Sequence, residues 1–124
     1  MRVALLLVLA LLSGGKDRVP EGAWGGRDAS LHVGDRGAEV EFNCSHGGIA
    51  EPLSLDEEGA FRARGYWVRE GGPTMPEEDR RPAVYSGRLD GKTLTLRVVV
   101  EDPKRELGPF TLVLGEPARL IKCD

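Results

Sequence analysis

The strongest constraint on this chain is a two-residue alternation of apolar and polar side chains that recurs to its C-terminus. In residues 29–33, alanine, leucine and valine alternate with serine and histidine, and a Gly-Asp-Arg-Gly turn follows. In residues 38–44, an apolar set ending in Cys44 alternates with glutamate and asparagine. Because side chains on a strand point alternately to its two faces, residues 22–44 predict a half-buried antiparallel hairpin entered through Gly22.

The same alternation predicts further strands along the rest of the chain. Asp90-Gly91 is the strongest short-range hairpin sequence among the turns, and no helical period follows the N-terminal leader. Regular short strands with short connections are typical of a sandwich or an up-and-down barrel. The remaining expected strands are 49–55, 60–70, 83–89, 93–101, 107–114 and 118–123, which makes eight in all.

The first residues have the three parts of a secretory leader. Arg2 supplies positive charge, residues 3–12 form a ten-residue apolar run, and small residues end the segment. Ten apolar residues are too few to cross a bilayer of about 30 Å as a helix, so we expect no membrane span. Leu12-Ser13-Gly14 resembles the start of a bacterial lipoprotein signal, but Gly15 stands where the lipidated cysteine would be.

This leader divides the chain into three parts. We expect a signal peptide over residues 1–15, a polar tether over 16–21 and one β-barrel domain over 22–124. The mature protein is then exported, to the periplasm or outside the cell.

Export gives the two cysteines a role. An even pair in a small exported domain usually forms a disulfide, so we expect Cys44 to bond with Cys123. Two free thiols or a metal pair are the alternatives, and neither has CxxC spacing or a nearby histidine other than His46. Closing so long a loop would stabilise the fold by at most about 4–5 kcal/mol.

The cysteines also favour a barrel over a sandwich. In an eight-stranded up-and-down barrel, the second and eighth expected strands run in the same direction on either side of the first. Cys44 and Cys123 would then lie at one end, beside the entry of Trp24. We therefore predict an all-β, eight-stranded antiparallel up-and-down barrel, with one end closed by the disulfide and the tryptophan.

Gly22-Ala23-Trp24, just before the first expected strand, resembles the signature of lipocalins and related calycins. In that family the tryptophan closes the base of the barrel. The eight-strand meander and the C-terminal cysteine fit the same picture, and the size resembles compact bacterial lipocalin-like barrels. The resemblance implies a fold but no ligand, and barrels of this class include protease and lysozyme inhibitors.

Charge and residue types argue against catalysis, a cofactor or nucleic-acid binding. The 17 basic and 20 acidic residues are mixed along the chain, whereas nucleic-acid binding needs clustered positive charge. The sequence contains no recognisable catalytic set. His46 is the one candidate for a metal or a proton switch, with help from Glu77, Glu78 or Asp79, but a plain turn histidine is the better interpretation and we expect no metal site.

Two binding modes remain. A barrel of eight strands is filled by side chains or holds one small ligand. For a carrier of a small hydrophobic ligand, the contacting residues would be aromatic side chains on the inner face: Trp67, Tyr85, Phe42 and Phe110.

If the interior is filled, binding moves to the longest loop, residues 71–82. Prolines in this loop reduce the entropy lost on binding, which suits recognition of a protein partner; a solvated connection is the plainer alternative. We predict a monomeric, non-catalytic, inhibitor-like binding module acting through this loop, and a carrier as the alternative. The loop residues expected to contact the partner are Thr74, Met75, Glu77, Glu78, Asp79, Arg80 and Arg81.

Overall fold

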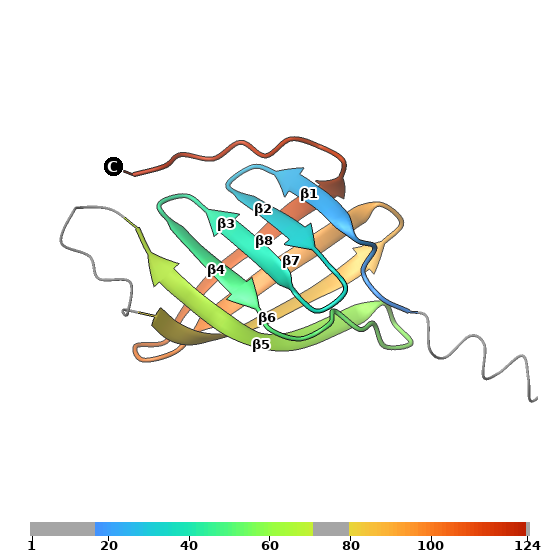
Figure 1. Cartoon of the computed structure of the whole chain (residues 1–124), viewed down its shortest axis with the longest axis horizontal. Helices are drawn as coiled ribbons and strands as arrows, with labels where there is room; N and C mark the ends of the chain where they lie inside the picture. The colour runs from blue at the N-terminus through green and yellow to red at the C-terminus, as the bar shows by residue number, and fades with distance from the viewer. Residues whose placement is uncertain (1–16, 71–79, 124) are drawn as a thin grey trace, which may run out of the picture.

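The structure is a single closed β-barrel (Figure 1). It is a computed structural model and describes residues 17–70 and 80–123. Each strand pairs antiparallel with the next along the chain, and β8 returns to pair with β1. The strands are β1 (Gly22–Gly26), β2 (Ala29–Val33), β3 (Ala38–Phe42), β4 (Ser45–Ile49), β5 (Ala60–Arg69), β6 (Arg80–Asp90), β7 (Thr93–Val100) and β8 (Arg105–Leu114).

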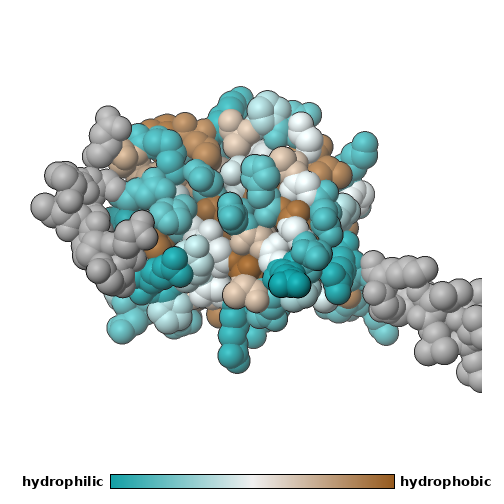
Figure 2. Space-filling view, viewed as in Figure 1, coloured by the Kyte–Doolittle hydropathy of each residue, from teal (hydrophilic) through white to brown (hydrophobic). Residues whose placement is uncertain are grey.

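The apolar side chains of the alternating strands fill the interior. On the clean strand β7, Leu94, Leu96, Val98 and Val100 are fully buried, while Arg97 between them is exposed. The outer face seen in Figure 2 is correspondingly covered mainly by hydrophilic residues, with apolar residues showing in smaller areas. The all-β fold, the eight strands and the closed up-and-down order predicted from the sequence are confirmed.

A buried tyrosine occupies the space that a glycine leaves on the facing wall. Tyr85 is fully buried, and its hydroxyl donates a 2.8 Å hydrogen bond to the Tyr66 carbonyl. A Cβ added to Gly47 would collide with the Tyr85 hydroxyl oxygen and the Tyr66 carbonyl oxygen. Gly47 is therefore required by the close approach of the phenol rather than by an unusual backbone angle.

One end of the barrel, where β1 begins, is closed by the segment before β1. The Val19 amide donates to the Leu53 carbonyl at 3.0 Å, and both side chains are only 2% exposed. The Trp24 indole is 1% exposed, and its Nε1 donates to the Pro20 carbonyl at 3.0 Å. We call this the N-terminal end. Residues 17–20, which we expected to be part of a tether, pack against the barrel here.

After β8 the chain turns back and runs beside β1 as an extended tail (Figure 1). The Gly115 amide donates to the Ala23 carbonyl at 2.8 Å, and the Arg119 amide donates to the Gly26 carbonyl at 2.9 Å. Farther along, the Asp28 amide donates to the Arg119 carbonyl at 2.9 Å. The tail thus covers β1 from the N-terminal end to the opposite end of the barrel.

One observed strand was not expected, one expected strand is displaced, and one expected strand is absent. Gly22–Gly26 is a strand and not only an entry, and the fourth strand is Ser45–Ile49 instead of 49–55. Residues 118–123 form no strand, and Ile121 is 67% exposed instead of inward. Glycines in β1 and β4 hid the alternation because they carry no side chain to reveal a face.

The predicted meeting of Trp24 and the disulfide at one end is also wrong. Trp24 points toward Pro20 at the N-terminal end. Cys44 follows β3, whose last residue, Phe42, pairs with Ala29 at the opposite end. The tail runs along the whole length of β1 to reach Cys44. It is not the eighth strand of the barrel, as the prediction required.

Replacing Gly47 by alanine is expected to lower the free energy of unfolding by about 1–3 kcal/mol, because the added methyl group overpacks the interior. The loss should be smaller when Tyr85→Phe has already removed the hydroxyl. The matched control is Gly34→Ala, whose Cβ would meet nothing closer than the Gly37 oxygen at 3.8 Å and should change stability by about 0.5 kcal/mol or less. Urea unfolding of Gly47→Ala, Tyr85→Phe, the double variant and Gly34→Ala measures these changes. An equal loss of unfolding free energy for Gly47→Ala with and without Tyr85→Phe would contradict the packing described.

Candidate functional site

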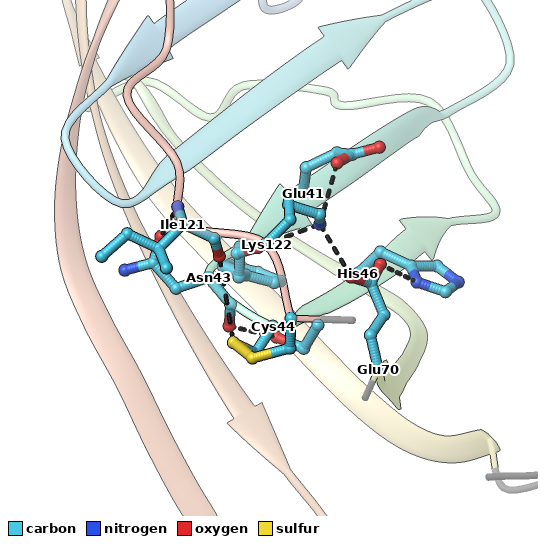
Figure 3. Close-up of polar contacts among 10 residues, drawn as sticks. Glu41, Asn43, Cys44, His46, Glu70, Ile121 and Lys122 are labelled. Carbon is cyan, nitrogen blue, oxygen red and sulfur yellow. Dashed lines mark hydrogen bonds and ion pairs between the residues drawn. A yellow bond between two sulfur atoms is a disulfide. The ribbon is translucent and has the colours of Figure 1, made fainter. Parts of the chain in front are cut away.

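The disulfide fixes the tail to the end of the barrel opposite Trp24, which we call the disulfide end (Figure 3). Cys44 and Cys123 are bonded across 79 positions of sequence, with their Cα atoms 4.9 Å apart, as the sequence predicted. The Cys44 amide donates to the Ile121 carbonyl at 3.1 Å, and the Ile121 amide donates to Asn43 Oδ1 at 2.7 Å. Backbone and side-chain hydrogen bonds therefore hold the tail next to the bridge. A disulfide is consistent with an exported protein.

A group of charged side chains lies on the outer face beside the bridge (Figure 3). Lys122 Nζ lies 3.1 Å from a Glu41 carboxylate oxygen and 2.9 Å from a Glu70 carboxylate oxygen. The other Glu70 oxygen lies 2.7 Å from His46 Nδ1. The tail is thus joined by ion pairs to β3 and to the end of β5. We call Glu41, His46, Glu70 and Lys122 the tail cluster.

Two pKa values in the tail cluster depart from their usual range. Burial alone would raise the pKa of Glu70, but hydrogen bonds from Lys122 and His46, with their charges, hold this pKa below its ordinary value. Burial alone would lower the pKa of Lys122, but Glu70 and Glu41 together raise it. Glu70 and Lys122 therefore both stay charged at neutral pH, and their ion pair fastens the tail electrostatically.

The role of the tail cluster is not evident in the sequence. The sequence predicts His46 in a turn near acidic residues of the loop, whereas His46 lies on β4 and contacts Glu70. Glu41 and His46 lie on neighbouring strands and Glu70 directly follows β5, and only the folded barrel defines the register that brings them together. In that register His46 faces Glu41 on one side and Val68 on the other. No local pattern in the sequence could have joined Lys122 to them.

At the disulfide end, the first residues of β6 and β8 are arginines that lie over aromatic rings of β5. The Arg80 guanidinium carbon lies 4.0 Å from the centre of the Tyr66 ring, and the Tyr66 ring covers Gly48. The Arg105 guanidinium carbon lies 5.4 Å from the centre of the Trp67 ring. Arg81 donates to the Asp102 carbonyl at 3.1 Å.

Only part of the expected partner loop can be placed. Arg80 and Arg81 are the first residues of β6, at the disulfide end. The remaining expected contacts lie outside the described residues: Thr74, Met75, Glu77, Glu78 and Asp79.

The interior residues expected to hold a ligand make contacts with the protein itself. The Phe42 and Phe110 rings are 5.4 Å apart between centroids, and the Tyr85 hydroxyl is satisfied by Tyr66. Burial raises the pKa of Tyr85 far above its ordinary value, with a smaller contribution from Tyr66, so Tyr85 stays neutral. Trp67 is 4% exposed, and its Nε1 has no hydrogen-bond partner within the described part of the chain.

Comparison of this chain with protein-family models, with curated proteins and with solved structures found no match. Within residues 17–70 and 80–123, no three His, Cys, Asp or Glu side chains are grouped so as to hold a metal ion. The same residues include no helix of the length and apolarity that a membrane crossing requires.

Replacing Glu70 by glutamine should lower the free energy of unfolding near neutral pH by about 1 kcal/mol or less, as for other partly exposed ion pairs. The pKa of Glu70 is lower in the folded state than its ordinary 4.5. Its contribution is therefore present above that pH and lost as the pH falls through the folded-state value. Chemical unfolding from neutral to acidic pH should show the difference between wild type and variant shrinking. The control Glu106→Gln, an exposed residue on β8, should show no such trend, and a constant difference for Glu70→Gln would contradict the assignment.

Proposed function

We propose that this chain is an exported, non-catalytic binding protein with a lipocalin-like barrel. It engages a protein partner at the disulfide end, through residues 71–82 and the strand ends that carry them. The observation that carries the proposal is the stacking of Arg80 on Tyr66 at that end, 4.0 Å from guanidinium carbon to ring centre.

Arginine and tyrosine are the residue types that most often supply binding energy at protein interfaces. Here both are held before any partner arrives. Tyr66 lies against Gly48, where a side chain would displace the ring. Arg80 pairs with Val68 in the β5–β6 ladder, so the two strand ends form one surface. A preorganised surface loses less conformational entropy on binding, which favours affinity.

Three features support export and the lipocalin-like class. The leader over residues 1–15 has the composition of a secretory signal, and the domain carries a disulfide. Trp24, in the Gly-x-Trp sequence, closes one end of an eight-stranded up-and-down barrel. The inhibitors in this structural class raise the expectation of an inhibitor-like role, although fold alone does not determine function.

The proposal predicts a partner whose capture depends on Arg80. Oxidised mature protein, immobilised through an added N-terminal tag, is incubated with the extracytoplasmic fraction of its own host. Arg80→Gln should retain the partner at least about tenfold less than wild type, since the charge that stacks on Tyr66 and would be desolvated against the partner is lost. Arg36→Gln, an exposed arginine in the turn after β2, should retain it unchanged. Equal retention by both variants would contradict the proposed surface.

A second function, the carrier of a small hydrophobic ligand, is favoured by one observation. The buried Trp67 Nε1 donates to no described group, and a ligand with one acceptor oxygen would satisfy it. The predicted contacts are Trp67, Tyr85, Phe42 and Phe110.

The carrier function predicts that Trp67→Phe, which keeps an aromatic ring but removes the donor, weakens binding of a medium-chain ketone by about tenfold. The matched control is Trp24→Phe, which should bind the ketone as wild type does because the Trp24 Nε1 already donates to the Pro20 carbonyl. Calorimetric titration of the oxidised protein measures this, and no heat of binding to wild type would exclude the carrier function for such ligands.

A further inference from the structure

The outer face of β5, β6 and β7 carries arginines around a central serine. The register places Arg62 opposite Ser86 and Ser86 opposite Arg97, so all three side chains point outward in one row. In the neighbouring row, Arg88 lies between Ala60 and Thr95. Arg62, Arg88 and Arg97 are all exposed, and this concentration of positive charge occurs in a chain whose formal net charge is −3.

These arginines line a groove of about 670 Å³ that also includes Ser86, Thr95 and Phe61. We call it the arginine groove. One wall is the outer face of the sheet, and the other is the segment from Ser54 to Asp56 before β5. Asp56 is the single acidic residue among those that line it, and its carboxylate already accepts hydrogen bonds from the Glu58 and Ala60 amides.

The charges of the groove are incompletely neutralised within the protein. Arg88 lies 3.8 Å from a Glu58 oxygen, a long pair between two well-exposed side chains. Neither Arg62 nor Arg97 forms a side-chain hydrogen bond or ion pair with any described residue. Like charges gathered on one face of a sheet repel one another, and a bound anionic group would relieve that repulsion.

The size and composition of the groove point to a segment of polypeptide more than to a free ion. Its volume equals that of roughly twenty water molecules at about 30 Å³ each, far more than one phosphate needs. Its lining includes the apolar Leu55, Ala60 and Phe61 in addition to the arginines. Such a mixed surface suits side chains that alternate between carboxylates and small or apolar groups.

The strand spacing agrees with an extended segment. Arg62 and Arg97 lie two strands apart, which is about 9.5 Å between their backbones. Carboxylates two residues apart in an extended chain lie about 6.7 Å from each other on the same side, between the two arginines. Guanidinium groups bind carboxylates through paired, charge-assisted hydrogen bonds.

We propose that the arginine groove binds an extended acidic segment of a partner protein. Two carboxylates that are two residues apart in this segment bind to Arg62 and Arg97. The acidic turn of Asp56 and Glu58 borders the groove and would repel carboxylates placed there, so the binding register is set by both signs of charge. This inference goes beyond the function proposed above, because it concerns the outer face of the sheet and not the disulfide end.

The test uses the oxidised mature protein and a fluorescent peptide of alternating glutamate and serine, with blocked ends. Fluorescence anisotropy at about 20 mM salt should show binding that weakens strongly at about 150 mM. A peptide with glutamine in place of glutamate should not bind. Arg62→Gln and Arg97→Gln should each weaken binding of the glutamate peptide by at least about tenfold, as expected for the loss of a hydrogen bond between charged groups.

The matched control is Arg69→Gln, an exposed arginine on β5 at the disulfide end. It should bind the peptide as wild type does, and melting curves should show all three variants folded. The proposal fails if wild type does not bind at low salt, or if Arg69→Gln loses as much affinity as the other two. It also fails if millimolar inorganic phosphate displaces the peptide and itself binds with the same dependence on Arg62 and Arg97. Arg80 does not line the groove and is unchanged in all of these variants. The result is therefore independent of the partner capture at the disulfide end.

Discussion

The barrel closes through a short contact between β1 and β8, and the course of the tail and the position of the disulfide are tied to this closure. Only Trp24 with Leu114 and Gly25 with Val113 are paired across this contact. The barrel is therefore least firmly joined where its first and last strands meet. The tail compensates by pairing with the outer edge of β1 and by crossing to Cys44, where the disulfide holds it. A bridge across so long a loop stabilises the folded state by up to about 4–5 kcal/mol in the chain-entropy account. Glu41 and Glu70 then hold Lys122 on the same side.

The fold also depends on glycines that leave room for aromatic rings. Gly47 leaves room inside for Tyr85, and Gly48 leaves room outside for Tyr66. The interior is thereby occupied by the protein's own side chains, while a tyrosine and the arginine stacked on it are displayed outside. This arrangement favours the proposed recognition by outer surfaces over the proposed transport of a ligand. The Trp67 Nε1, which has no partner among the described residues, is the observation in favour of the carrier function.

Much of this fold could be predicted because period-two alternation carries over directly into strands. It is clear for β2, β3 and β7, and the disulfide follows from two cysteines in a chain that is expected to be exported. The strands β1 and β4 were hidden, because a glycine-rich strand owes its place to neighbouring side chains that the local sequence does not show. The tail was mistaken for a strand since Ile121 and Cys123 are in phase, yet its backbone pairs with β1 at only a few points. The tail cluster and the arginine groove both depend on register across strands, which no single segment encodes.

We propose that the barrel, fastened by its disulfide and filled by its own side chains, binds through its outer surfaces. Native mass spectrometry of the protein, purified from its own host without reductant, is the sharpest test of this proposal. We expect a monomer whose mass is lower than the reduced value by the two hydrogens lost in the Cys44–Cys123 bond, with no additional small molecule. A co-purified small molecule that remains on the folded protein and is released on unfolding would contradict it.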